Sequence, residues 1–264
     1  MAKIYKGPQI TGSLGDISAV KRYDLPNVYL RYKGGASKER IKHDSNFART
    51  RENNSEFSGV AASVKNLRNT IYEVIKFGDS LATGRLTKIL KAIQLADSTI
   101  LRGQRPVRFS MFGKWLNDFE LNKNVPLNSV IKISEYTINR ETSSATLVIP
   151  TLIPGINFSN PWHQPKYRIV VVLSTLQDMY YTKLGYKPLE QFNSSKVVCK
   201  SFNSGFVESN LVLNELTINL QLDGIALNDS SSLILAIGVQ FGNEQPGGTK
   251  AVKRANCAKI IAIV

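Results

Sequence analysis

The sequence predicts an α+β protein in which an N-terminal β-hairpin and a helical hairpin precede a C-terminal antiparallel β-sandwich. Three changes of pattern along the 264 residues support this fold class. Glycine and proline punctuate an extended arm and β-hairpin over residues 1–36, basic helical segments occupy residues 37–104, and short alternating runs fill the sandwich region, residues 105–264. Helices and strands are therefore grouped rather than interleaved, which disfavours a parallel α/β sheet. The 42% of apolar residues suffice for a sizeable core.

The hairpin of the first region is expected from two runs of strand-forming residues, at 17–21 and 28–33. Asp24 and Pro26 lie between these runs and favour a turn. Residues 1–12 are too polar and too rich in glycine to build a core of their own. Because ordering them costs roughly 1–2 kcal/mol per residue, we expect them to dock outside the hairpin, as a strand added to the edge of a neighbouring subunit's sheet.

Two amphipathic helices joined by a short turn are expected in the second region. Over residues 55–75 the apolar side chains fall within an arc of about 140°, the width of a core-facing stripe. Arg68 lies in the same arc and must either reach solvent or meet a carboxylate, because an unpaired buried guanidinium is costly. Asp44 or Ser45 can cap a short preceding helix. Residues 83–96 place on one face Leu86, Ile89, Leu90 and Ile93, and on the opposite face Arg85, Lys88 and Lys91.

The third region is expected to form many short strands. The clearest alternation sets Leu216, Ile218, Leu220 and Leu222 against polar neighbours. Segments rich in glycine, asparagine and proline separate the strands, as is typical of antiparallel sandwiches. The expected strands span residues 107–112, 129–138, 145–151, 167–174, 195–201, 211–222, 232–241 and 258–263.

The charge of the chain is unevenly distributed. Lys and Arg number 34 and Asp and Glu number 20, which gives a net charge of +14. Residues 1–125 hold 22 basic and 11 acidic residues, whereas residues 126–264 hold 12 and 9. This imbalance predicts a negatively charged partner, or a neighbouring subunit that offers acidic residues.

If the partner is a nucleic acid, the candidate contacts are six basic residues on and after the helix 83–96, since their density can neutralise phosphates. They are Arg85, Lys88, Lys91, Arg102, Arg105 and Arg108. The competing interpretation is a solvated basic helix face. Aromatic residues are not regularly interleaved with these positions, so a stacking platform for single strands is not indicated.

No combination of residues points to an enzyme. The only histidines, His43 and His163, lie in no metal-ligand or catalytic motif, and no phosphate-binding glycine loop occurs. We therefore expect no catalytic, cofactor-binding or metal-ligating residue and no cofactor. Cys199 and Cys257 are too few for a disulfide framework and are expected to be reduced, buried thiols. No apolar run is typical of a signal peptide or a membrane span, which predicts a cytoplasmic protein with no membrane partner.

Ordered motifs in the N-terminal half carry a resemblance to a known family. They are Gly12-Ser13-Leu14-Gly15-Asp16-Ile17, Arg31-Tyr32-Lys33-Gly34-Gly35, Arg40-Ile41, Asp44, Phe47-Ala48-Arg49-Thr50-Arg51-Glu52-Asn53, Glu56-Phe57, Ser80 and Arg85-Leu86-Thr87. In order and spacing over residues 12–100 they resemble a family of uncharacterised proteins that recur in Bacteroidota genomes. The resemblance implies a bacterial cytoplasmic protein. It implies no activity, so it assigns no site residue.

The leading hypothesis is a non-enzymatic structural subunit that self-assembles into a homo-oligomeric filament, tube or shell in the bacterial cytoplasm. It depends on the extended arm, the many strand edges and the scarcity of reactive groups. Clustered charges at residues 49–56 indicate ion pairs across a contact, either within the fold or between subunits. Trp162, in a loop stiffened by two prolines, fits either an interface knob or ordinary packing. The candidate assembly contacts are Ile4, Tyr5, Ile10, Arg49, Arg51, Glu52, Glu56 and Trp162. The alternative is a cytoplasmic nucleic-acid-binding module that uses the basic N-terminal half.

Overall fold

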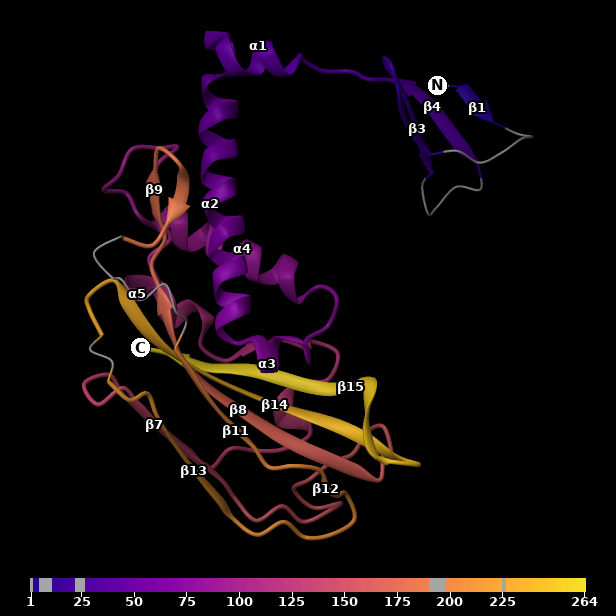
Figure 1. The fold of residues 1–264 in the computed structure, drawn as a ribbon, viewed down its shortest axis with the longest axis vertical. Helices are drawn as coiled ribbons and strands as arrows, with labels where there is room; N and C mark the ends of the chain where they lie inside the picture. The colour runs from indigo at the N-terminus through magenta and orange to yellow at the C-terminus, as the bar shows by residue number, and fades with distance from the viewer. Residues whose placement is uncertain (1, 5–10, 22–26, 190–197, 225–226) are drawn as a thin grey trace. The chain divides into compact units, whose positions relative to one another are not determined.

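The computed structural model describes residues 2–4, 11–21, 27–189, 198–224 and 227–264. The chain forms two compact units, unit 1 over residues 1–51 and unit 2 over residues 52–264. Unit 1 contains one small sheet, whereas unit 2 contains the sandwich and the helices that pack on it (Figure 1).

Unit 1 is built on a four-stranded antiparallel sheet, and the expected hairpin supplies its two central strands. The strand order is β1 (Ala2–Ile4), β4 (Val28–Tyr32), β3 (Ile17–Lys21) and β2 (Gly12–Leu14). After the sheet come α1 (Lys38–His43) and η1 (Ser45–Phe47). The Asp44 carboxylate accepts a hydrogen bond from the Asn46 amide, which confirms the predicted cap of the short helical segment.

Two antiparallel sheets face each other in unit 2, which confirms the α+β class and the C-terminal sandwich (Figure 1). The large sheet has the order β11 (Cys199–Asn203), β8 (Lys166–Gln177), β14 (Ser231–Gln245), β15 (Gly248–Ile263) and β5 (Phe119–Glu120), and β12 (Val207–Glu208) also pairs with β8. The small sheet has the order β13 (Leu216–Gln221), β7 (Ser144–Ile149) and β6 (Glu135–Asn139). A separate two-stranded ribbon pairs β9 (Tyr180–Thr182) with β10 (Gly185–Lys187).

One hydrophobic core fills the space between the two sheets of unit 2. Along β13, Ile218 and Leu220 are buried in this core, whereas Thr217, Asn219 and Gln221 are exposed. This is the alternation that a strand with one buried face requires. The clearest pattern of the sequence is therefore confirmed, and it marks the inner face of the small sheet.

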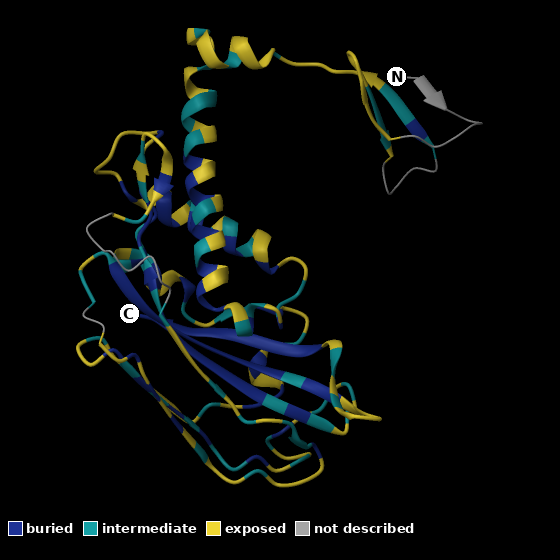
Figure 2. Ribbon diagram, in the orientation of Figure 1, coloured by how far each residue is buried: buried dark blue, intermediate teal, exposed yellow. Residues whose placement is uncertain are grey.

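Helices cover the opposite face of the large sheet and form a second core with it. They are α2 (Ala48–Thr70), α3 (Tyr72–Ile75), α4 (Ala82–Ala96), α5 (Phe109–Phe112) and η2 (Gly113–Leu116). Much of β14 is consequently buried on both faces and shows no alternation (Figure 2). Gly238 of β14 leaves room for the Phe77 ring, which a β-carbon at this position would strike.

The helical region keeps its predicted faces but is not a separate unit. Leu90 of α4 is fully buried and Lys88 is exposed, as predicted. Arg68 is exposed, so its guanidinium reaches solvent, which is the first of the two predicted possibilities. Phe57 belongs to the apolar arc that was predicted to be buried, but it is 56% exposed. The boundary expected near residue 104 does not separate compact units, because the helices share their core with the large sheet.

The prediction of a strand at residues 107–112 is wrong. Apart from an isolated bridge at Val107, this segment enters the short helix α5. The Ser110 amide and hydroxyl both donate hydrogen bonds to the Asp178 carboxylate, at 3.0 and 2.6 Å. A residue distant in the sequence therefore stabilises the helical turn, and local alternation could not reveal it.

Three other expected strands begin later than predicted, and the strand expected at 211–222 is observed only from Leu216. Residues 129–138 contain strand only from Glu135 onward, after the helical turn η3 (Leu127–Ser129). The strand expected at 195–201 is observed from Cys199, and residues 195–197 lie outside the described residues.

Candidate functional site

The sheet of unit 1 has an apolar face whose Leu14, Ile17 and Tyr32 end is exposed to solvent, whereas Val28 at the other end is buried. In the strand register Leu14 lies opposite Ile17, and Ile17 lies opposite Tyr32, so the three side chains share one face. Leu14 is 86% exposed and Tyr32 is 80% exposed. We call this surface the apolar face of unit 1, and it comprises Leu14, Ile17, Ala19, Val28, Leu30 and Tyr32.

The opposite face of the same sheet is more polar, and little of the described part of unit 1 is buried. Ser13, Ser18 and Arg31 lie opposite one another on that second face. Among the described residues of unit 1, Val28 is the only buried hydrophobic residue, and α1 buries none. A small sheet with so little buried area is only marginally stable in water.

The sequence interpretation missed this face, although a signal for it was present. Val28, Leu30 and Tyr32 alternate with Tyr29 and Arg31, which is the period of a strand with one apolar side. The alternation does not say whether the apolar side is covered. Only the burial of the folded chain shows that its Leu14 and Tyr32 end is exposed and that Val28 is buried.

The arm residues predicted to dock on another subunit are placed differently. Ile4 lies in β1 and pairs with Val28 of β4, so this strand completes the sheet of its own unit rather than docking outside the hairpin. The β4 edge accepts it because the hairpin leaves that edge unpaired on its other side. Tyr5 and Ile10 lie outside the described residues.

Trp162 is packed within unit 2 rather than standing out as a knob. Its ring centroid lies 5.2 Å from that of Phe241, and it contacts the core between the sheets. The surrounding loop is held by its own hydrogen bonds, since the Asn160 side chain donates to the Gln164 carbonyl at 2.6 Å and accepts from the Gln164 amide at 3.1 Å. This position agrees with the second interpretation of the sequence, in which Trp162 is an ordinary packed side chain.

The charges at residues 49–56 are largely engaged within the chain. The Arg51 guanidinium donates to the carbonyl oxygens of Ile41 and Asp44, each at 2.8 Å. Glu52 forms an ion pair with Arg102 at 3.5 Å. Arg49 is exposed. Of the two locations that the sequence left open for these ion pairs, the structure shows pairs within the fold.

Glu56 is the centre of a buried polar cluster. Its side chain is 1% exposed, and its carboxylate lies 2.7 Å from Lys91 Nζ, 3.7 Å from Arg105 Nη1 and 2.9 Å from the Gly103 amide nitrogen. Burial raises the pKa of Glu56, but the hydrogen bonds from Lys91 and Gly103 and the two positive charges outweigh burial and leave this pKa below its ordinary value. Gln94 extends the cluster by donating to the carbonyl oxygens of Glu56 and Arg105. The cluster joins α2, α4 and the segment after α4.

The six predicted nucleic-acid contacts do not form one free basic face. Five of them make ion pairs within unit 2, whereas Lys88 is exposed. The pairs are Arg85 with Asp79, Lys91 and Arg105 with Glu56, Arg102 with Glu52, and Arg108 with Asp97. The side chains of Asp97 and Glu56 are 3% and 1% exposed, so their cationic partners are drawn toward the interior. These charges stabilise the fold and are poorly placed to neutralise phosphates.

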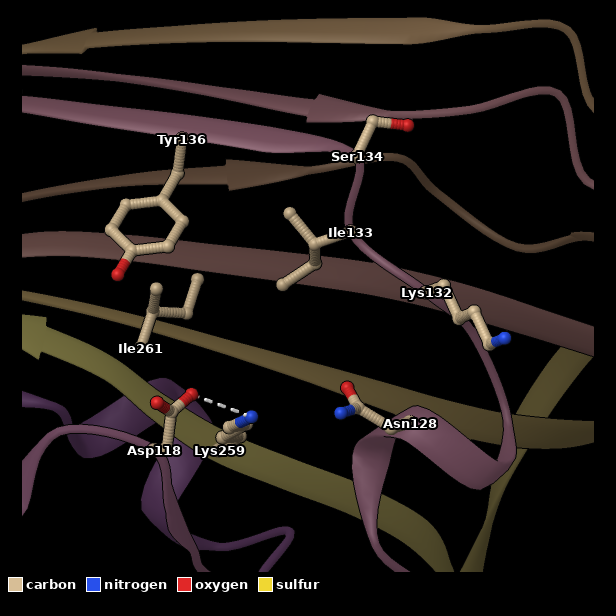
Figure 3. Close-up of a pocket in the computed structure, with 8 residues that line it drawn as sticks. All are labelled: Asp118, Asn128, Lys132, Ile133, Ser134, Tyr136, Lys259 and Ile261. Atoms are coloured by element: carbon tan, nitrogen blue, oxygen red, sulfur yellow. Dashed lines mark ion pairs between the residues drawn. The ribbon is translucent and has the colours of Figure 1, made fainter.

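A pocket of about 310 Å³ opens at the flank of the sandwich, where β6 faces β15 (Figure 3). Lys259 on its floor forms an ion pair with Asp118 at 2.7 Å and lies 4.0 Å from Glu120. Burial raises the pKa of Glu120 above its ordinary value. Tyr136 and Ile261 supply apolar surface, and the lining residues include neither histidine nor cysteine. The pocket therefore combines charged, polar and apolar side chains.

Comparison of the chain with models of protein families, with curated proteins and with solved structures gives no match. The resemblance to the Bacteroidota family thus remains an expectation from the motifs. None of the helices described in the structure combines the length and the apolar character needed to cross a membrane.

Proposed function

We propose that the chain is a non-enzymatic structural subunit that self-assembles into a larger particle, such as a filament, tube or shell, with unit 1 as the connector. The observation that carries the proposal is the apolar face of unit 1. Leu14, Ile17 and Tyr32 form an exposed row across three strands of a sheet in which Val28 is the only buried hydrophobic side chain among those described. Covering this row with a second protein layer removes apolar surface from water and supplies the missing core.

A second copy of the same face is well suited to provide that layer. Two sheets pack face to face about 10 Å apart when their apolar sides meet. Unit 1 holds 11 basic and 4 acidic residues, so a contact between two copies must keep like charges apart. In the strand register Arg31 lies on the polar face, away from such a contact. Among the described residues of β2, β3 and β4, Lys21 at one end is the only charged residue on the apolar side.

The alternative, nucleic-acid binding, receives less support from the geometry. Five of its six candidate residues already hold carboxylates within unit 2. We place the particle in the bacterial cytoplasm. The bacterial source follows from the resemblance of the motifs, and the free thiols of both cysteines support a reducing compartment. Cys257 is buried as expected, whereas Cys199 is exposed, so the expectation of burial is wrong for Cys199.

The test is the size of the nuclease-treated full-length protein, measured by light scattering after size exclusion and by negative-stain microscopy. The double variant Leu14→Lys/Tyr32→Lys places charge on the apolar face, and Ser13→Lys/Ser18→Lys is the matched control on the other face. We expect particles from the wild type and the control, and small species with native circular dichroism from the double variant.

Two results would contradict the proposal. One is a wild-type protein that is monomeric at all concentrations tested. The other is a double variant that assembles as well as the wild type, which would remove the apolar face from the contact. Particles that disappear on nuclease treatment alone would favour the nucleic-acid alternative.

A further inference from the structure

A second pocket of unit 2, of about 440 Å³, lies beside an irregular part of strand β15. The loop between α3 and α4 contributes Asp79 and Ser80, the segment after β5 contributes Asn124, and Trp162 lines the pocket from its own loop. Strand β15 contributes Arg254 and Asn256 to the lining of the pocket. The proposed assembly surface in unit 1 contributes no residue to it.

The backbone of β15 is distorted where it lines this pocket. Gln240 of β14 pairs with Asn256, but the next pair joins Gly242 to Ala251, so residues 252–255 lie opposite Phe241 alone. Such bulges re-aim side chains and are common beside binding sites. Arg254 within the bulge has φ of 66°, a left-handed conformation that is unfavourable for a residue with a β-carbon. Backbone strain of this kind clusters at functional sites.

Asn256 offers an amide that lacks a protein partner. The residue is 7% exposed and lines the pocket, yet within the described part of the chain its side chain makes no hydrogen bond. Solvent reaches this amide from the pocket, so it can bind a polar group there, whereas amides sealed in the interior are normally paired within the protein. Asn122 beside it shows the usual outcome, because its side-chain nitrogen donates to the Asn256 carbonyl at 2.7 Å and its oxygen accepts from the Asn124 amide at 3.1 Å.

The charges and surfaces of the pocket define the ligand that would satisfy it. Arg254 is exposed and, among the described residues, makes no ion pair, so its guanidinium is available to a carboxylate or a phosphate. Asp79 does not repel such an anion strongly, because its carboxylate is held by Arg85 at 2.9 Å and by the Lys123 amide at 2.9 Å. The Asn256 amide can donate and accept at once, which matches a hydroxyl group. Trp162 adds apolar surface against which a ring can lie.

We propose that this pocket binds a hydroxylated ring that carries an anionic group, the chemistry shared by sugar phosphates and sugar acids. The guanidinium of Arg254 binds the anion, the amide of Asn256 binds a ring hydroxyl, and Trp162 covers one side of the ring. The bulge in β15 serves to bring Arg254 and Asn256 to the same pocket.

Isothermal titration of the full-length protein tests this site with four probes: glucose 6-phosphate, glucuronate, glucose and inorganic phosphate. We expect saturable binding of at least one anionic sugar, with at least tenfold weaker binding of glucose and of inorganic phosphate. Which anionic sugar binds distinguishes a phosphate from a carboxylate ligand. If neither anionic sugar binds the wild type, or if inorganic phosphate alone binds as tightly, the proposal is wrong.

Two variants at the bulge separate binding from folding. Arg254→Gly removes the guanidinium, while glycine accepts the positive φ without strain, so the melting temperature should not fall. We expect this variant to bind the anionic sugar at least tenfold more weakly than the wild type. Lys253→Ala, at the adjacent exposed position outside the pocket lining, is the matched control and should bind as the wild type does. Unchanged affinity of Arg254→Gly would overturn the assignment.

Discussion

Replacing Glu56 by alanine removes the carboxylate at the centre of the cluster that joins α2 to α4. Three groups lose their partner in this variant: the Lys91 ammonium, the Arg105 guanidinium and the Gly103 amide. Removing one member of a buried ion pair costs about 3–5 kcal/mol, because the remaining charge is left unpaired. The side chains of Lys91 and Arg105 are 31% and 23% exposed, so they regain part of their hydration. We therefore expect a loss near the lower end, about 3 kcal/mol.

The loss is measured by urea unfolding, followed by circular dichroism and tryptophan fluorescence. In a unit of about 200 residues each kcal/mol lowers the melting temperature by about 2–4 °C, so a fall of about 6–12 °C should accompany the change. Glu215→Ala is the matched control, because Glu215 is an exposed loop residue, and it should stay within about 0.5 kcal/mol of the wild type. A loss below about 1 kcal/mol for Glu56→Ala would refute the view that this cluster stabilises the fold.

The pH dependence supplies an independent check with Glu56→Gln, which keeps the shape but not the charge. The pKa of Glu56 is lower in the folded chain than in the unfolded chain, so the unfolded state binds protons more readily in acid. The stability that the carboxylate contributes is thus fully present above the unfolded pKa and is lost as the pH falls through the folded pKa. The difference in free energy of unfolding between the wild type and Glu56→Gln should shrink steadily in this acidic range. A difference that stays constant there would contradict the ion-pair explanation.

Three further predictions concern the cores and the thiols. Leu90→Ala should cost about 2–5 kcal/mol in urea unfolding, since Leu90 is fully buried between α4 and the large sheet, and a loss below about 0.5 kcal/mol would show that this face is not core. Gly238→Ala should cost about 1–3 kcal/mol through overpacking against Phe77, and Phe77→Leu in the same chain should recover part of the loss. A maleimide should label Cys199 in the folded protein but Cys257 only after denaturation, because burial shields the Cys257 thiol and raises its pKa. Equal labelling rates for the two cysteines would contradict the burial of β15.

Secondary-structure elements that depend on a regular sequence pattern, or on residues close together in the sequence, could be predicted. The apolar face of α4 and the alternation of β13 depend on periods of 3.6 and 2 residues, and both faces are buried except that Ile89 and Leu216 are half-buried. The hairpin of β3 and β4 depends on a turn between two short runs and is also found. In each case the residues that determine the element lie within about 20 positions of one another.

Elements that depend on distant residues were not predictable in the same way. The helical turn α5 is held by Asp178, and β14 is covered by helices on one face and by the small sheet on the other. A central strand of this kind has no polar side, so its pattern does not reveal which layer covers it. The pocket beside Arg254 likewise depends on a bulge, and the irregular register of that bulge is set by pairing with β14.

The charge of the chain shows most clearly why composition alone misplaces a site. The helix 83–96 looked basic because its acidic partners are few and lie elsewhere, on α2 and in the loops around α4. Once those pairs form, a strong local excess of positive charge remains in unit 1, with its 11 basic and 4 acidic residues. Both hypotheses about function therefore involve the small sheet of unit 1, but they predict contacts on opposite faces of it. Self-assembly uses the face of Leu14 and Tyr32, whereas a polyanion would be drawn to the face of Arg31. Variants on the two faces can thus separate the hypotheses without disturbing the core of unit 2.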